Sequence, residues 1–128
     1  MKVVALDFGR ARTGVAVSDP TGTLARPLGV VEQAATEAGL ARVAALVRDE
    51  GAEEVVVGMP LTLRGQRGDQ ARETEAFVET LRAVVDVPVE TFDERFTTTL
   101  AEQGGNGTPA DARAAAHLLT GYLEWRRR

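Results

Sequence analysis

The chain has 128 residues, of which 44% are hydrophobic and 27% charged, the proportions of a globular protein with a sizeable core. It has no cysteine, which excludes disulfides and thiolate metal sites, and no apolar run approaches the ~20 residues that span a bilayer. The net charge is −4, and fourteen of the fifteen basic residues are arginine, which either a GC-rich genome or phosphate recognition would explain. We expect a single domain over residues 1–128, located in the cytoplasm because no export signal is visible.

The first half of the chain predicts three strands and a helix. Lys2–Asp7 is an apolar run typical of a buried strand, and Gly14–Ser18 follows closely enough to form an antiparallel hairpin with it. A third strand is expected at Leu28–Glu32. Apolar residues then recur at helical spacing over Thr36–Glu50, and Gly51 is placed to end that helix.

The second half of the chain predicts crossover connections between parallel strands. The expected elements are a strand at Glu54–Gly58, a loop at Met59–Asp69, a helix at Gln70–Val85, a strand at Val87–Phe92, a short helix at Thr97–Gln103 and a last helix at Pro109–Trp125. The order β-β-β-α-β-α-β-α-α predicts an α/β fold. Its mixed five-stranded sheet begins as an antiparallel meander, continues with parallel strands and carries helices on both faces.

Carboxylates stand at the ends of several of these elements. Asp7 ends the first strand, Asp93 and Glu94 follow the last one, and Asp111 lies near the start of the last helix. Because sites in open α/β sheets gather at the carboxyl ends of parallel strands, we expect Asp7 and the Asp93-Glu94 pair at one edge. Each acid also has a structural interpretation. Asp7 could accept hydrogen bonds from the following loop, Asp93 and Glu94 could be solvated, and Asp111 belongs to a TPAD pattern typical of helix capping, with proline at the first helical position.

If these carboxylates meet, their chemistry favours a hard metal ion. Oxygen ligands without cysteine suit Mg²⁺ or Mn²⁺, and two such ions ~4 Å apart can hold both the attacking water and the leaving oxygen of a phosphodiester. The single histidine, His117, lies among apolar residues of the last helix, which favours a packing or surface role over catalysis. A Ser-His-Asp triad is therefore not expected.

Four stretches of the chain, in order, resemble one known family. DFGRARTGVAVSD, VVVGMPLTLRG, DERFTTTLAE and DARAAAHLLTGYL are similar to the YqgF/RuvX family and together span nearly the whole chain. This family comprises candidate Holliday junction resolvases, also described as nucleases of pre-16S ribosomal RNA, and has a ribonuclease-H-like fold. The resemblance implies a metal-dependent nuclease that processes the 5′ end of pre-16S rRNA, resolves branched DNA, or both.

The resemblance also implies roles for individual residues. Asp7 would be the first ligand of Mg²⁺ or Mn²⁺, Asp93 or Glu94 the second, and Asp111 the third. The choice between Asp93 and Glu94 stays open, because consecutive residues of a regular strand point to opposite faces. Residues near the motifs would contact nucleic acid: Arg10, Arg12, Arg64, Arg67, Arg95, Thr97 and Thr98. Arg95 could instead pair with an acid, and the two threonines could cap a helix.

One segment departs from the family's pattern. Where members commonly carry a longer, basic segment before the last aspartate, this chain has GGNGTPA. Attraction of nucleic acid then depends on arginines elsewhere, including the tail Arg126–Arg128, for which a frayed, solvated terminus is the alternative.

Two other functions and one assembly remain as alternatives. The fold could serve a non-catalytic RNA or protein adaptor. DFGRARTGVA also resembles the phosphate loop of actin-like ATPases, but those proteins need two such domains and over twice this length. The expected partner is nucleic acid, RNA or DNA, with no membrane. A homodimer is an option because resolvases act on symmetric junctions.

Overall fold

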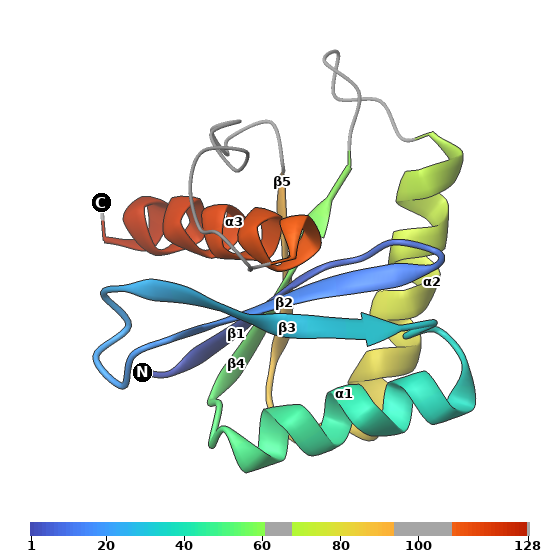
Figure 1. Cartoon of the computed structure of the whole chain (residues 1–128), viewed down its shortest axis with the longest axis horizontal. Coiled ribbons are helices and arrows are strands. Elements are labelled where there is room, and N and C mark those ends of the chain that lie inside the picture. Colours follow the sequence, from blue (N-terminus) through green and yellow to red (C-terminus); the bar gives the residue numbers. More distant parts are fainter. Residues whose placement is uncertain (61–67, 94–108, 128) are drawn as a thin grey trace.

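A mixed sheet of five strands organises the computed structural model, which describes residues 1–60, 68–93 and 109–127. The strands lie in the order β3-β2-β1-β4-β5, and Figure 1 shows them with the three described helices. β1, β2 and β3 are antiparallel neighbours, whereas β4 is parallel to both β1 and β5. The element bounds are β1 Val3–Asp7, β2 Arg12–Ser18, β3 Ala25–Glu32, α1 Glu37–Asp49, β4 Glu54–Met59, α2 Asp69–Val84, β5 Val89–Asp93 and α3 Ala110–Arg126. This is the α/β architecture that the order of elements predicted.

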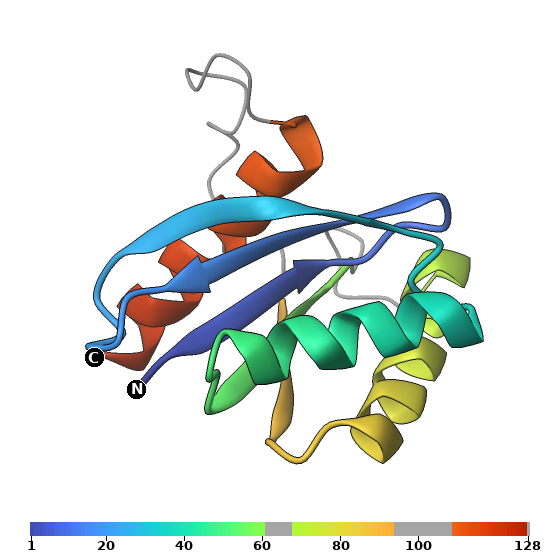
Figure 2. The same ribbon diagram turned by 60° about the horizontal axis from the view of Figure 1, so that its bottom comes forward.

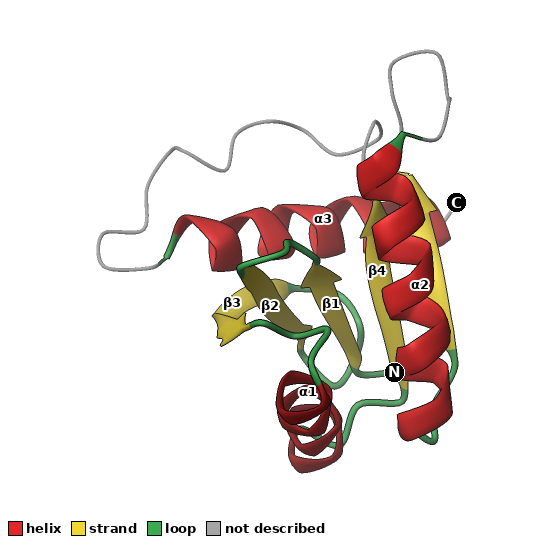
Figure 3. Ribbon diagram, turned by 90° about the vertical axis from the view of Figure 1, so that its right-hand side faces the viewer, coloured by secondary structure: helices red, strands yellow, loops and turns green. Residues whose placement is uncertain are grey.

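Helices cover both faces of the sheet. Val4 and Leu6 of β1 pack in one cluster with side chains of α1 and α2, whereas Val3 and Ala5 pack in a second cluster with α3. Figures 2 and 3 show α1 and α2 on one side of the sheet and α3 on the other. All six residues of β4 are buried, which explains why that strand is a continuous apolar run. Residue parity in the central strands therefore tells which face a side chain is on.

Two element boundaries follow local chemistry closely. The hydroxyl of Thr36 accepts a hydrogen bond from the Gly39 backbone N–H at 3.1 Å, so Thr36 caps α1. Gly51 has φ +65° just beyond the helix, a conformation that suits glycine. The helix predicted at Thr36–Glu50 is confirmed to within a residue at each end.

Other boundary expectations are wrong: β2 begins at Arg12 rather than Gly14, and β5 begins at Val89 rather than Val87. β3 begins at Ala25 rather than Leu28, because an edge strand accommodates Pro27, and the register of β2 against β3 shifts between Val15 and Ala16 opposite it. At the start of α3, Pro109 is the N-cap, with φ −57° and ψ 140°, rather than the first helical residue, and it makes no side-chain capping hydrogen bond. The helix predicted at Thr97–Gln103 lies outside the described residues.

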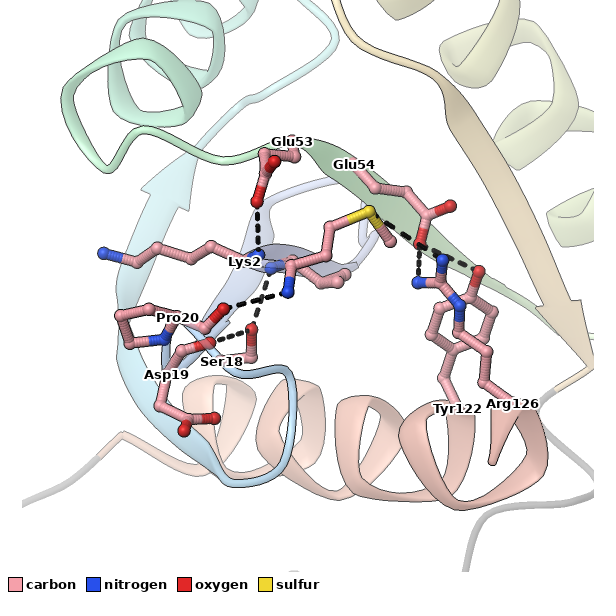
Figure 4. Close-up of polar contacts among 10 residues, drawn as sticks. Lys2, Ser18, Asp19, Pro20, Glu53, Glu54, Tyr122 and Arg126 are labelled. Carbon is pink, nitrogen blue, oxygen red and sulfur yellow. Dashed lines mark hydrogen bonds and ion pairs between the residues drawn. The ribbon is translucent and has the colours of Figure 1, made fainter. Parts of the chain in front are cut away.

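An ion pair between exposed Arg126 and buried Glu54 closes the end of the sheet where β4 begins. Glu54 is 8% exposed, and its Oε1 accepts hydrogen bonds from the Tyr122 hydroxyl at 2.9 Å and from Arg126 at 2.7 Å. Figure 4 shows the last turns of α3 meeting the start of β4 through these contacts. Burial and the hydrogen bond to Glu54 raise the pKa of Tyr122 to about 12. Arg126 is thus an ordered part of α3 and not a frayed tail residue.

Within the part of the chain that the structure describes, no helix has the length and apolar character needed to cross a membrane.

Candidate active site

Asp7 is the last residue of β1, at the carboxyl end of the parallel strands. It is half-buried, and it lies opposite Gly14 of the antiparallel neighbour β2. Asp7 has the parity of Val3 and Ala5, which pack against α3. Its side chain is therefore on the α3 face of the sheet.

Gly14 brings the start of α3 onto the sheet beside Asp7. A Cβ atom at position 14 would lie 1.8 Å from the backbone oxygen of Asp111 and 2.3 Å from its carbonyl carbon. Because residues directly opposite each other in a sheet share a face, this missing Cβ and the Asp7 side chain point the same way. Asp7 and Asp111 therefore flank one glycine on the same face, as the metal-site hypothesis requires.

Asp111 also carries an ion pair that the sequence did not reveal. Its Oδ2 lies 3.2 Å from Nε of Arg12, and the two side chains are 36% and 64% exposed. An exposed pair of this kind contributes little to stability, so either partner can exchange it for another contact. Arg12, expected to bind nucleic acid, thus lies directly beside an expected metal ligand.

Asp93 does not share the face of Asp7. β5 is separated from β1 by β4, and Asp93 lies opposite Met59 at the end of the ladder. Phe92 packs with the α3 cluster, and Val89 packs with the cluster on the other face. Alternation along β5 therefore places Asp93 on the α1 and α2 face. The remaining expected site residues, Glu94, Arg95, Thr97, Thr98, Arg64 and Arg67, lie outside the described residues.

The described residues supply only part of a metal site. Across residues 1–60, 68–93 and 109–127, no three histidine, cysteine, aspartate or glutamate side chains are grouped closely enough to hold a metal ion. Asp7 and Asp111 supply two carboxylates of the type that Mg²⁺ and Mn²⁺ prefer. A metal would fit these residues with at least one further oxygen ligand from the rest of the chain.

Arg10 lies on the other side of the hairpin, against α2. Its Nε donates to both carboxylate oxygens of Glu73, at 3.0 and 2.7 Å, and its Nη2 also contacts Glu73. This hydrogen-bonded pair raises the pKa of Arg10 and lowers the pKa of Glu73, so both remain charged at neutral pH. Sequence reasoning missed Glu73, because no local pattern links two residues 63 positions apart.

The comparisons with known proteins decide the family. The family model described as "RuvX: Holliday junction resolvase" matches residues 1–125. This chain belongs to the RuvX family. Its relatives include a protein of Anaeromyxobacter sp. that is 43% identical, with the match covering 98% of this chain and 98% of that protein. A relative from Rubrobacter xylanophilus is 46% identical, over 96% of this chain and 92% of its own. Both relatives are described as candidate pre-16S rRNA nucleases.

Solved structures support the fold of this RuvX-family chain. T. thermophilus RuvC in complex with a Holliday junction substrate matches with a TM-score of 0.62 at 22% identity, over 99% of this chain and 96% of that one. The Fowlpox virus resolvase, also in complex with Holliday junction DNA, matches with a TM-score of 0.62 at 12% identity, over the full length of both chains. The ribonuclease-H-like fold expected from the resemblance is thereby confirmed.

Proposed function

We propose that residues 1–128 form one nuclease domain that uses Mg²⁺ or Mn²⁺ to hydrolyse phosphodiester bonds of nucleic acid. The observation that carries this proposal is the packing at Gly14, which brings the backbone of Asp111 onto the face of the sheet that carries Asp7, at the carboxyl ends of the parallel strands. Membership of the RuvX family supports the same activity.

The third ligand in this proposal is Glu94 rather than Asp93. Phe92 faces α3, so the residue two positions later has the same parity as Phe92 if the strand's alternation continues. Asp7 is on that same face, whereas Asp93 is on the opposite one. Glu94 is therefore the member of the pair suited to join Asp7 and Asp111.

Asp7, Asp111 and Arg12 have distinct roles in this proposed site. Bound divalent ions would activate a water and stabilise the departing oxygen of the phosphodiester. Two carboxylates would bind these ions: that of Asp7, fixed at the end of a buried strand, and that of Asp111, fixed by the packing of α3 on Gly14. Arg12 is 64% exposed beside them, and its planar guanidinium suits a phosphate of the backbone.

The substrate we propose is precursor 16S ribosomal RNA, cut near its 5′ end in the cytoplasm. The relatives described as candidate pre-16S rRNA nucleases, among them two that are 41% and 43% identical over 98% of this chain, support this choice. Branched DNA is the second candidate, favoured by the family's description and by the likeness to RuvC. On that substrate a homodimer would place one site on each of two strands. Arg64, Arg67, Arg95, Thr97 and Thr98 remain proposed contacts to either nucleic acid.

The test compares the wild type with Asp7→Asn and with Asp49→Asn, a control that removes an exposed carboxylate from the end of α1. Each protein is incubated with Mg²⁺ or Mn²⁺ and with end-labelled precursor rRNA, single-stranded DNA or a four-way junction. We expect cutting by the wild type and by Asp49→Asn, and none by Asp7→Asn. Circular dichroism verifies that all three are folded.

The outcomes separate the candidate functions. The substrate cut fastest decides between rRNA processing and junction resolution. If folded wild-type protein cuts nothing with either metal, the nuclease proposal fails and a non-catalytic adaptor gains support. Equal cutting by wild type and Asp7→Asn would show that Asp7 does not belong to the catalytic site.

A further inference from the structure

A pocket of about 370 Å³ lies between the β1–β2 hairpin and α2, on the face of the sheet away from Asp111. A second cavity of about 330 Å³ shares Phe8, Arg10 and Glu73 with it and extends along the start of α2. Figure 1 shows the tip of this hairpin reaching across to α2. None of the tasks assigned to the catalytic residues uses this pocket.

The floor of the pocket is rigid and apolar. The rings of Phe8 and Phe77 are stacked with centroids 4.4 Å apart and an interplanar angle of 15°, and they are 8% and 2% exposed. Ala35, before α1, and Ala76, on α2, add small exposed walls. The small exposed parts of the two rings, together with the two alanines, give the pocket an apolar lining that suits contact with a flat ring.

The rim of the pocket is charged. Arg10 is 78% exposed and Glu73 is 35% exposed, and both line the two cavities. The guanidinium offers hydrogen-bond donors, and its plane can stack on a base. The carboxylate offers acceptors, which suit the amino groups on base edges.

The position of the pocket relates it to the proposed catalytic site. Phe8 directly follows Asp7, and its parity places it on the opposite face of the same strand end. A strand of nucleic acid crossing this end of the sheet can therefore present a phosphate to Asp7 and a neighbouring base to the pocket. A base within a duplex has its edge paired, so only an unpaired base can enter.

We propose that this pocket binds one unpaired base of the nucleic acid, next to the phosphate that is cut. The inference rests on the proposed nuclease function and makes the substrate a single-stranded segment. Phe8 and Phe77 form the floor under the base, Glu73 accepts from amino groups on its edge, and Arg10 donates to the adjoining phosphate.

The test measures binding without metal, so that it does not depend on cutting. Fluorescence anisotropy gives the Kd for a short single-stranded RNA with bases and for an abasic strand of equal length and charge. We expect the wild type to prefer the strand with bases by at least about tenfold, the scale of one stacked base. Ala76→Phe, which fills the pocket from an exposed position, should lose that preference and keep the affinity for the abasic strand.

Matched controls keep the result interpretable. Ala44→Phe places the same ring in a separate pocket of about 190 Å³ between α1 and the end of α2, and it should behave as the wild type. Ala35→Phe fills the proposed pocket from another element and should repeat the effect of Ala76→Phe. The proposal is overturned if the wild type binds both strands equally or if both pocket-filling variants retain the preference. If the wild type cuts nucleic acid but shows no preference for the strand with bases, the proposed nuclease function stands and only the base-binding pocket is disproved.

Discussion

At the scale of single residues, Gly14 decides whether Asp111 can approach Asp7. The backbone of α3 occupies the space that a Cβ would need, so any other residue must push the helix away from the sheet. The stretch between Asp7 and Gly14 reads from the sequence as a turn with two glycines. The structure shows that the second of these, Gly14, expected at the start of the strand, also packs against α3 from within β2.

Gly14→Ala should therefore damage both stability and activity. We expect the free energy of unfolding to fall by about 1–3 kcal/mol, the usual cost of overpacking, and cutting to weaken because Asp111 moves. Gly29→Ala is the matched control, because a Cβ at position 29 of β3 meets nothing within 4 Å. Urea denaturation of both variants measures the difference. Equal stability of the two would contradict the close contact between α3 and β2.

Tyr122 gives a second test at this scale, because it is the only tyrosine in the chain. Ultraviolet absorbance of tyrosinate should show a midpoint of about 12 in the folded protein. After unfolding in denaturant, the midpoint should fall to about 10. Because the folded pKa is the higher one, this contribution to stability is complete below pH ~10 and is lost as pH rises through about 12.

Removing the Tyr122 hydroxyl tests the same contact at neutral pH. Tyr122→Phe leaves the buried Glu54 carboxylate with one donor fewer, and we expect a loss of about 1–3 kcal/mol in the free energy of unfolding. Cutting should be unchanged, because Glu54 lies at the opposite end of β4 from the site. A variant as stable as the wild type in urea would show that the hydroxyl contributes nothing there.

At the scale of elements, the turn between β2 and β3 is organised by one carboxylate. Asp19 accepts hydrogen bonds from the backbone N–H groups of Thr23 at 2.8 Å and Leu24 at 2.9 Å, and from the Thr21 hydroxyl. The hydrogen bond from Thr21 contributes most, and the backbone hydrogen bonds contribute next, to holding the pKa of Asp19 far below its usual range. Gly22, with φ +72°, completes the turn.

The turn predicts a specific acid sensitivity. A carboxylate with a lowered folded pKa stabilises the protein above its unfolded pKa of about 4 and loses that effect as the pH falls further. Thermal unfolding between neutral and acid pH should therefore show a smaller pH-dependent loss of stability for Asp19→Asn than for the wild type. Identical pH profiles would show that Asp19 does not hold the turn.

Local patterns predicted most elements, and long-range packing explains what they missed. The apolar run of β4 and the Thr36 and Gly51 boundaries of α1 are readable because each depends on neighbours in sequence. The early start of β3 at Ala25 is not readable from the sequence, because only pairing with β2 makes a segment that contains Pro27 a strand. The Arg12–Asp111 and Arg10–Glu73 pairs likewise join residues that only the folded chain brings together.

At the scale of the whole molecule, the two faces of the sheet divide the proposed functions. The α3 face carries Asp7 and Asp111, and the α1 and α2 face carries the pocket floored by Phe8 and Phe77. One strand end serves both, since Asp7 and Phe8 are consecutive. The same alternation separates Asp93 from Asp7. The choice between Asp93 and Glu94 stayed open in the sequence, because the sequence does not show which face of β5 meets α3.

The most direct test of this account is to measure the rate of metal-dependent cutting for Glu94→Gln and Asp93→Asn side by side. Each variant removes one negative charge, so the two match in charge, and only Glu94 is assigned to the metal in the proposed site. We expect Glu94→Gln to abolish cutting and Asp93→Asn to retain it. Loss of cutting in Asp93→Asn together with full activity in Glu94→Gln would contradict the assignment of the metal site to the α3 face.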